Sequence, residues 1–506
     1  MQCNILYQKA SPSNPAKAHL TVKCEGKSVP LAVGTVDLAQ PAKVAEFVDG
    51  LVEKYPGINK ETFNDELLEL ADRLLNSERD DGDDGDESEP VKPLDLSKIE
   101  LNTTSDELIR AAQEFGNRPD LFDLTTSHMQ ALGLAGEKDL AGQLYVIGTS
   151  RLAPNPLAGA ITSGSASGKS YSVNTVCSAM PPEAVFKAHR MTPQALMHLP
   201  EGSLERRLMH LGERSRDTSD EVAENTRNFR ELIEDHECRQ AITQKGPDGK
   251  FVTTYRVQKG PVAWIETTTL GPDAIFTEDR TRLLMLCANE SSEQTQRVLD
   301  WQAANAMAPA DPDEIETIRK LHHTFQRLLQ PKRVKIPFAG ELTRVIPNDR
   351  LEARRAFAHL LAIIQAIAIL HQFQREAVDS DTILALPADY EIARRVFADP
   401  LGRSIGRTLT TGAQMMLDRM DEEFDARATF TAHEIEESTG VARSSVYDRL
   451  RELRKSGHVR LVESGSGPVP ARYGFGVPSE AAEFFLPCLS SSDARTLTMP
   501  SECKSL

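Results

Sequence analysis

The stretch "ITSGSASGKSYSVNTV", Ile161 to Val176, indicates the fold of the central part of the chain. A short apolar run ends in small residues, continues into Gly168, Lys169 and Ser170, and is followed by a segment that can extend as a helix. Glycines and a lysine between a strand and a helix are typical of a phosphate-binding loop (P-loop), whose backbone N–H groups surround a phosphate. The strict pattern GxxxxGK[ST] has glycine where this chain has Ser163, and a serine-rich turn before a helix is the alternative interpretation.

Each part of the loop has a role in the first interpretation. The Lys169 ammonium reaches the terminal phosphates of ATP, the Ser170 hydroxyl coordinates Mg²⁺, and the helix N-terminus favours anions. We therefore predict ATP and Mg²⁺ as cofactors. The predicted nucleotide-binding residues are Gly164, Ser165, Ala166, Ser167, Gly168, Lys169 and Ser170.

Two further apolar runs end in polar residues that suit a nucleotide site. In "RRLMHLGERS", residues 208–211 are predicted to form a strand that places Glu213 at its carboxyl end as the catalytic base. In "GPVAWIETTTL", a strand over 262–265 is followed by Thr267 and Thr268, which are candidate sensors of the γ-phosphate. The alternatives are a solvent-exposed glutamate and ordinary turn chemistry.

A basic hairpin is predicted between these two strands. The stretch "RQAITQKGPDGKFVTTYRVQKG" alternates on both sides of a Gly-Pro-Asp-Gly turn, with Lys245 and Lys250 at the tip. These lysines either contact a DNA backbone or only keep an exposed hairpin soluble.

Three arginines flank the apolar segments that follow. Arg282 precedes an apolar strand, and Arg354 and Arg355 stand at the head of a buried helix over 356–370. Arginines near a P-loop core stabilise transition-state charge, in the same subunit or from a neighbouring one. Salt bridges at the protein surface are the alternative for each of them.

The C-terminal stretch "FTAHEIEESTGVARSSVYDRLRELRKSGHVRLVES" has the spacing of a helix-turn-helix. Thr431 caps a short helix, Gly440 makes the turn, and a second helix over 442–455 is followed by two strands, which together predict a winged helix. Such modules bind DNA, although some dock proteins. The predicted DNA contacts are Arg443, Ser444, Ser445 and Tyr447 toward the groove and Arg449, Arg451, Arg454, Lys455 and Arg472 toward phosphates.

Composition sets the limits of these predictions. The chain has 506 residues, a formal charge of −17 and seven cysteines without a CxxC pair, so we expect a cytoplasmic protein without a disulfide framework or zinc knuckle. The negative charge restricts DNA to local surfaces. The apolar run over 356–370 is too short for a membrane span, and the N-terminus lacks the pattern of a signal peptide.

The sequence predicts an α/β protein with accessory segments. In the N-terminal segment "AHLTVKCEGKSVPLAV" predicts a hairpin, and "KVAEFVDGLVEKY" and "ETFNDELLELADRLL" predict helices. The predicted segments are a small α+β module (1–77), an acidic disordered linker (78–99), a P-loop ATPase core (100–310), a helical lid and connector (311–426), the winged helix (427–475) and a disordered tail (476–506).

From about 120 to 475 the chain resembles the ATPase region that follows zinc-finger and toprim modules in primase-like proteins of bacteria, phages and mobile elements. The matching stretches are "GQLYVIGTSRLAPNPLAGAITSGSASGKS", "MPPE", "GPVAWIETTTL", "TRLLML", "EQTQRVL", "ARRAFAHLLAIIQAIAILHQFQRE" and "VARSSVYDRLRELRKSGHVRLV".

That family looks like an AAA+-type P-loop ATPase, related to ring-forming helicases with a hairpin before the sensor strand. The resemblance implies that Lys169 and Ser170 bind ATP and Mg²⁺, that Glu213 is catalytic and that Thr267 or Thr268 is the first sensor. It further implies that Arg282 bridges subunits of a homo-oligomeric ring and that Arg354 or Arg355 is the second sensor. Two departures are Ser163 in the loop and Gly212 where a metal-organising Asp would stand.

These observations predict an ATP-dependent DNA-remodelling or helicase-like ATPase of DNA replication or mobile-element maintenance, with a primase or replication protein as a partner. The first alternative is a nucleotide-responsive winged-helix transcription regulator with little hydrolysis. The second is an adaptor in which the winged helix binds protein and the ATPase fold is a scaffold. The absence of CxxC pairs and of a recognisable acidic primase centre argues against primer synthesis.

Overall fold

The computed structural model divides the chain into two compact units, Met1–Lys92 and Pro93–Leu506. It describes residues 3–9, 17–24, 32–37, 41–54, 60, 67 and 96–486, apart from gaps at 165–166, 189–190, 214–219, 246–250, 269–281, 345–351, 405–408, 426–427, 466–468 and 477–485. Most of the predicted disordered tail and of the predicted acidic linker lies outside the described residues. Leu486, inside the predicted tail, is buried in the main core, so the prediction of disorder is wrong at this position.

The first unit contains a three-stranded antiparallel sheet and a helix. The strands β1 (Cys3–Lys9), β2 (Lys17–Cys24) and β3 (Ala32–Asp37) lie in this order, and α1 (Pro41–Lys54) follows. The predicted hairpin is confirmed by the antiparallel pairing of β2 with β3, and the first predicted helix by α1, which buries Val44 and Val48. Strand β1 was not predicted, and most of the second predicted helix lies outside the described residues.

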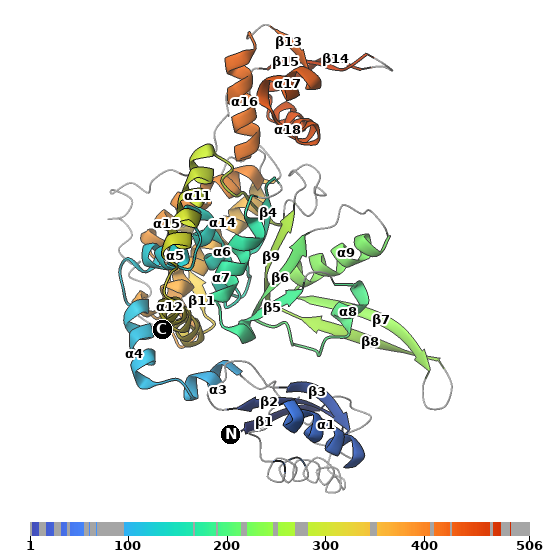
Figure 1. The fold of residues 1–506 in the computed structure, drawn as a ribbon, viewed down its shortest axis with the longest axis vertical. Helices are drawn as coiled ribbons and strands as arrows, with labels where there is room; N and C mark the ends of the chain where they lie inside the picture. The colour runs from blue at the N-terminus through green and yellow to red at the C-terminus, as the bar shows by residue number, and fades with distance from the viewer. Residues whose placement is uncertain are drawn as a thin grey trace. The chain divides into compact units, whose positions relative to one another are not determined.

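The second unit is built on a parallel sheet of five strands (Figure 1), which confirms the α/β prediction for the core. The strand order is β10-β4-β9-β6-β5, so neighbouring strands are not consecutive in the sequence. Parallel neighbours need crossover connections, and helices supply most of them. The strands are β4 (Ala158–Thr162), β5 (Val185–Ala188), β6 (Arg207–Glu213), β9 (Val262–Thr268) and β10 (Leu284–Leu286).

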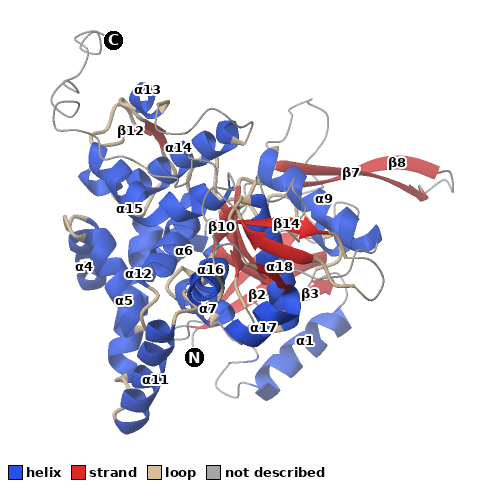
Figure 2. Cartoon of the chain, turned by 90° about the horizontal axis from the view of Figure 1, so that it is seen from above, coloured by secondary structure: helices blue, strands red, loops and turns tan. Residues whose placement is uncertain are grey.

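Helices cover both faces of this sheet (Figure 2) because successive side chains of each strand point to opposite faces. On β9, Ala263 and Ile265 join the core cluster that contains residues of α6 (Lys138–Ser150), α7 (Lys169–Ser178) and α14 (Ala353–Leu370). Val262 and Trp264 join the cluster that contains residues of α8 (Pro193–Met197) and α9 (Asp220–Glu234). Strands buried on both faces explain the continuous apolar runs in the sequence.

Further helices pack around the first of these faces. They are α3 (Leu96–Asn102), α4 (Asp106–Gly116), α5 (Leu121–Ala131), α11 (Ser292–Met307), α12 (Pro312–Leu328), α13 (Ala339–Leu342) and α15 (Pro387–Ser404), with the short strands β11 (Arg333–Lys335) and β12 (Thr382–Leu384). Helix α3 begins at Leu96, inside the range predicted as linker.

Helix α14 is the buried helix predicted from the apolar run over 356–370. Among the described residues it is the one helix long and apolar enough to cross a membrane by length and composition. Half of that helix is buried inside the protein, where Ile363, Ile364 and Ile367 belong to the main core. Core helices meet the same length and composition criterion.

The predicted hairpin is present between α9 and β9. Strands β7 (Glu237–Lys245) and β8 (Phe251–Lys259) pair antiparallel along nine residues each and form a ribbon that extends away from the sheet (Figures 1 and 2). At its base, Gln258 donates a hydrogen bond to the carbonyl of Leu199, which follows α8. The hairpin is therefore anchored where it leaves the core.

The C-terminal segment has its own small core, formed by α16 (Thr411–Glu423), α17 (Ala432–Thr439), α18 (Arg443–Lys455) and the sheet β13-β15-β14. The strands are β13 (Thr429–Thr431), β14 (Val459–Glu463) and β15 (Arg472–Phe475). Thr431 and Glu434 form a capping box at the start of α17, and Gly440 ends it with a left-handed φ of 66°. The predicted helices, turn and last two strands are thus confirmed, whereas β13 was not predicted.

Candidate functional site

The predicted phosphate-binding loop lies between the carboxyl end of β4, at Thr162, and the start of α7, at Lys169. Gly168 precedes the helix with φ at 80°, a conformation that glycine adopts at no steric cost. The first helical hydrogen bond of α7 runs from the Ser172 N–H to the Gly168 carbonyl. The backbone N–H groups before Ser172 therefore have no partner within the helix, and this end of α7 adjoins the loop. Of the predicted loop residues, Ser165 and Ala166 lie outside the described part of the chain.

Lys169 is buried at the centre of the loop, with 8% of its surface exposed. Its ammonium donates hydrogen bonds to the carbonyl oxygens of Ser163 at 2.7 Å and Gly164 at 2.6 Å. These two carbonyl oxygens hold the ammonium inside the loop, where a terminal phosphate of a bound nucleotide would compete with them for it. Ser170, the predicted Mg²⁺ residue, is exposed in the first turn of α7.

Ser163, the departure from the strict loop pattern, has a structural role. Its hydroxyl donates to the Thr162 carbonyl at 2.7 Å and accepts a hydrogen bond from the Ala288 N–H at 2.8 Å. Ala288 follows β10, the strand beside β4. A glycine at position 163 would lack the oxygen that joins the loop to this neighbouring segment.

The strand register aligns two predicted site residues with the loop strand across the carboxyl edge of the sheet. Thr267 on β9 lies opposite Ile161 on β4 and opposite Glu213 on β6. Because neighbouring strands are ~4.8 Å apart, the Glu213 backbone lies about 10 Å from the strand that leads into the loop. Thr267 and Thr268 are both buried, and the side chain of Glu213 lies outside the described residues.

The segment that follows β10 joins this edge through two carboxyl groups that sequence reasoning did not select. Glu290 accepts a hydrogen bond from the Gly164 N–H at 2.5 Å, and Glu137 accepts one from the Asn289 N–H at 2.9 Å. Burial raises the pKa of the Glu137 carboxyl to about 7. A polar residue just after a buried strand was the signal used for Thr267, and the same signal applies to Glu290.

Arg282 and Arg355 lie together at the amino ends of the strands, at the opposite edge from the loop. Arg282 precedes β10, and its guanidinium is 2.6 Å from Oε1 of Glu234, the last residue of α9. Arg355, in the first turn of α14, is 3.6 Å from the same oxygen. Arg354 is exposed beside it. The structure therefore brings Arg282 and Arg355 to each other but not to the loop of their own chain.

The tip of the β7–β8 hairpin is only partly described. Lys245 ends β7 and its side chain lies outside the described residues, as does the whole of Lys250. Nearby on β8, Phe251 and Tyr255 are 72% and 66% exposed. They are four residues apart on a strand whose side chains alternate between faces, so they share one face of the ribbon.

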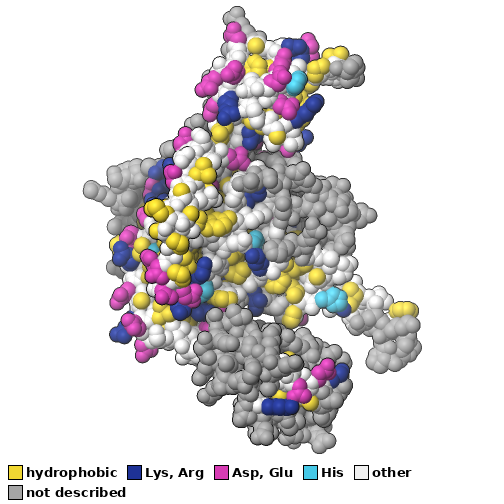
Figure 3. Space-filling model, in the orientation of Figure 1, with side chains coloured by type: hydrophobic (Ala, Val, Ile, Leu, Met, Phe, Trp, Pro, Cys, Tyr) yellow, Lys and Arg dark blue, Asp and Glu magenta, His cyan; other side chains and the backbone are white. Residues whose placement is uncertain are grey.

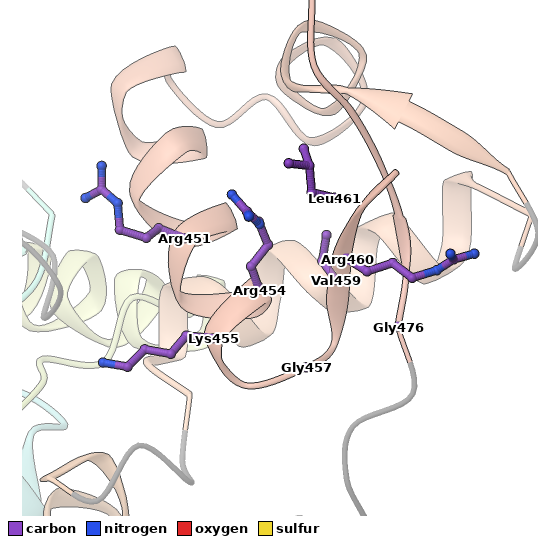
Figure 4. A pocket seen from close by; sticks show the side chains of 8 residues that line it. All are labelled: Arg451, Arg454, Lys455, Gly457, Val459, Arg460, Leu461 and Gly476. Atoms are coloured by element: carbon purple, nitrogen blue, oxygen red, sulfur yellow. The ribbon is translucent and has the colours of Figure 1, made fainter. Parts of the chain in front are cut away.

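A basic pocket of about 590 Å³ lies between the end of α18 and β14 (Figure 4). Arg454 and Leu461 point into the space between helix and strand, and the Arg454 guanidinium lies 6.0 Å from the Tyr473 ring centre. The positively charged lining residues are Arg451, Arg454, Lys455 and Arg460. Arg460 was not among the predicted contacts, because a basic residue on a short strand gives no distinctive pattern.

The other predicted DNA contacts are spread over this segment. Arg443, Ser444 and Tyr447 are exposed along α18, and Ser445 is half-buried. Arg472 donates hydrogen bonds to Thr429 on the neighbouring strand. Arg449 points elsewhere, to Glu290, which is 3.1 Å away. Figure 3 shows acidic and basic side chains mixed on the visible face of this segment, so its positive charge is local.

No protein-family model matches the chain, and no curated protein matches it either. The loop, the two edges of the sheet and the C-terminal segment therefore supply what can be inferred about function.

Proposed function

We propose that this chain is a P-loop ATPase of the AAA+ type that binds ATP and Mg²⁺ with residues 164–170 and uses hydrolysis to remodel DNA. The observation that carries this proposal is the position of Lys169, buried inside a glycine-containing loop between a central parallel strand and a helix N-terminus. That combination of a reaching lysine, loop amides and a helix N-terminus is the chemistry that binds phosphate groups.

The strand order supports a hydrolytic site. Strand β9, with Thr267 and Thr268 at its end, lies between the loop strand β4 and strand β6, which ends at Glu213. In this proposal Thr267 or Thr268 senses the γ-phosphate, Glu213 activates water, and Ser170 holds Mg²⁺. The helices from α12 to α16 would then form the lid and connector.

The distribution of arginines supports assembly into a homo-oligomeric ring. Arg282 lies at the opposite edge of the sheet from the loop of its own chain and pairs with Glu234. From there, a guanidinium reaches a nucleotide only in a neighbouring subunit, as arginine fingers supplied in trans do. Arg354 and Arg355 lie near Arg282 on α14, so in this proposal they also act at the subunit boundary.

The C-terminal segment supports DNA as the partner. Two helices joined by a tight turn and followed by a β-ribbon have the order of a winged helix, and α18 carries the exposed Arg443, Ser444 and Tyr447. The basic pocket beside it suits a phosphate backbone. We place this activity in the cytoplasm, in replication or mobile-element maintenance, with a primase or replication protein as a further partner.

A second candidate function is a nucleotide-responsive transcription regulator that binds ATP and hydrolyses little of it. The observation in its favour is the direct contact between Glu290, which bonds to the loop, and Arg449 on α18. A regulator needs such a connection between nucleotide and DNA-binding helix, and does not need turnover.

The test measures phosphate release by the purified full chain with no DNA, with single-stranded DNA and with duplex DNA. The variants are Lys169→Ala and a control, Lys320→Ala, which removes an exposed lysine on α12. The ATPase proposal expects DNA-stimulated release that Lys169→Ala abolishes and Lys320→Ala retains. Equal rates for wild type and Lys169→Ala would overturn it. Binding of ATP without release, together with a change in duplex affinity, would favour the regulator.

A further inference from the structure

We propose that Glu290 is a latch between the phosphate-binding loop and helix α18, and that nucleotide phosphates displace it. This inference rests on the proposed function, because it requires that the loop from Gly164 to Ser170 binds phosphate. It adds a coupling residue that transmits nucleotide occupancy to the DNA-binding segment.

One oxygen of the Glu290 carboxylate accepts a hydrogen bond from a backbone N–H of the loop. Oε1 accepts the Gly164 N–H at 2.5 Å, and the Cβ position of Gly164 would lie 3.2 Å from the same oxygen. Backbone N–H groups of such a loop are the donors that a bound phosphate uses. A protein carboxylate therefore stands where a phosphate oxygen is expected.

The other oxygen of Glu290 holds Arg449. Oε2 lies 3.1 Å from a terminal guanidinium nitrogen, and the two side chains are only 19% and 22% exposed. On its other side Arg449 packs against the start of α16, where a Cβ at Gly412 would lie 2.6 Å from the guanidinium. Arg449 is thus enclosed between α16 and the segment after β10, away from the exposed side of α18.

A second contact joins α18 to the start of α16, next to Arg449. The Glu452 carboxylate, one turn further along α18, accepts hydrogen bonds from the Thr410 N–H at 2.6 Å and from the Thr410 hydroxyl at 2.9 Å. Thr410 caps α16. Arg449 and Glu452 on α18 thus both contact the start of α16, close to the segment that follows β10.

Electrostatics makes Glu290 and a nucleotide mutually exclusive. The several negative charges of ATP repel a carboxylate that lies beside its phosphates. The carboxylate and a phosphate also compete for the same N–H. Nucleotide binding therefore expels the carboxylate, and Arg449 loses its partner and becomes available to a DNA phosphate. By linkage, DNA raises nucleotide affinity by the same factor by which nucleotide raises DNA affinity.

The first experiment measures the affinity of the full chain for a non-hydrolysable Mg-ATP analogue by calorimetry. Glu290→Gln keeps an oxygen that can accept the Gly164 N–H but removes the charge, so we expect affinity to rise by roughly tenfold. Glu293→Gln is the matched control, because Glu293 is an exposed carboxyl three residues further on in α11 and we expect it to leave affinity unchanged. Circular dichroism checks that both variants fold.

The second experiment measures binding of a labelled 20-base-pair duplex with and without the same analogue. We expect nucleotide to tighten binding by wild type, Glu290→Gln to bind tightly without nucleotide, and Arg449→Met to lose the nucleotide effect. If wild type binds no nucleotide, the proposed function itself fails. If wild type binds nucleotide but Glu290→Gln has the same nucleotide and duplex affinities as wild type, the latch is overturned and the proposed function stands.

Discussion

The two edges of the five-stranded sheet hold their positively charged side chains with different partners. At the carboxyl edge, backbone carbonyls of the loop hold the Lys169 ammonium. At the amino edge, the Arg282 and Arg355 guanidinium groups share the carboxylate of Glu234. The Lys169 ammonium thus lies inside the loop, whereas the two guanidinium groups lie at the far edge of the sheet beside a carboxylate. In our proposal the carboxyl edge binds the nucleotide of the same chain, and the amino edge acts on the nucleotide of a neighbouring chain.

This difference matters for how the arginines can act. Glu234 pairs with a half-buried guanidinium, that of Arg282, and with an exposed one, that of Arg355, and an ion pair near the surface contributes about 0–1 kcal/mol. Such a pair is weak enough to exchange for a charged group on a neighbouring subunit. In our proposal, assembly of the ring supplies that group, and the free chain satisfies its arginines internally.

The largest effect is expected from Glu213→Gln at the carboxyl edge. Removal of a general base lowers the rate of the chemical step by about 10²- to 10⁴-fold, and the amide has nearly the same size, so we expect nucleotide affinity to stay within a few-fold. Single-turnover hydrolysis and calorimetry measure the two quantities. The control is Glu422→Gln on α16, an exposed position. An unchanged rate in Glu213→Gln contradicts the role of this residue.

A smaller effect concerns pH and the half-buried Glu137, also at the carboxyl edge. Its pKa is raised from 4.5 to about 7, so the folded protein binds more protons than the unfolded chain between these values. The free energy of unfolding therefore falls as pH rises through this window. We expect Glu137→Gln to remove this loss and to be about 1 to 2 kcal/mol more stable than wild type at pH 8 but not at pH 4.

Urea unfolding at pH 4, 6 and 8 measures this difference. Glu114→Gln, at an exposed position on α4, is the control and should track wild type at each pH. A constant difference between Glu137→Gln and wild type at all three values would show that the carboxyl titrates normally.

The smallest effect is expected at the amino edge. Glu234→Ala removes the shared partner of Arg282 and Arg355, so we expect a loss of about 1 kcal/mol in the free energy of unfolding that shrinks at high salt. Nucleotide affinity of the isolated chain should not change, because these groups lie at the opposite edge from the loop. Arg227→Ala, which removes an exposed pair on α9, is the control. A drop in nucleotide affinity with Glu234→Ala would contradict the separation of the two edges.

The sequence predicted much of the fold because its signals are local. Apolar runs predicted β4, β6, β9, β10 and α14. The Gly-Pro-Asp-Gly turn predicted the hairpin, and Thr431 and Gly440 predicted the two ends of α17. Strand ends were less accurate: β9 continues through Thr268, beyond the predicted 262–265, because its polar threonines still pair with β4. Strand order is a long-range property that no local pattern contains.

The candidate site was predicted unevenly for the same reason. Lys169 and Gly168 follow from a pattern of adjacent residues, so they were found. The contacts of Glu290 and Arg449 join positions 159 residues apart, and those of Arg282 and Glu234 join two different elements. Spacing in one sequence cannot reveal such pairs. The register of β4, β9 and β6 was needed to place Thr267 between the loop strand and Glu213.

The length of the β7–β8 hairpin has a mechanical consequence. Each strand has nine residues, so the ribbon is about 30 Å long at the usual rise of a strand. Its base is anchored to the core near Leu199. A rotation of about 10° at the held end moves the far end by roughly 5 Å, which exceeds the 3.4 Å rise per nucleotide of duplex DNA. In our proposal, small movements of the core during ATP hydrolysis are therefore amplified at the far end of the hairpin to steps of about one base.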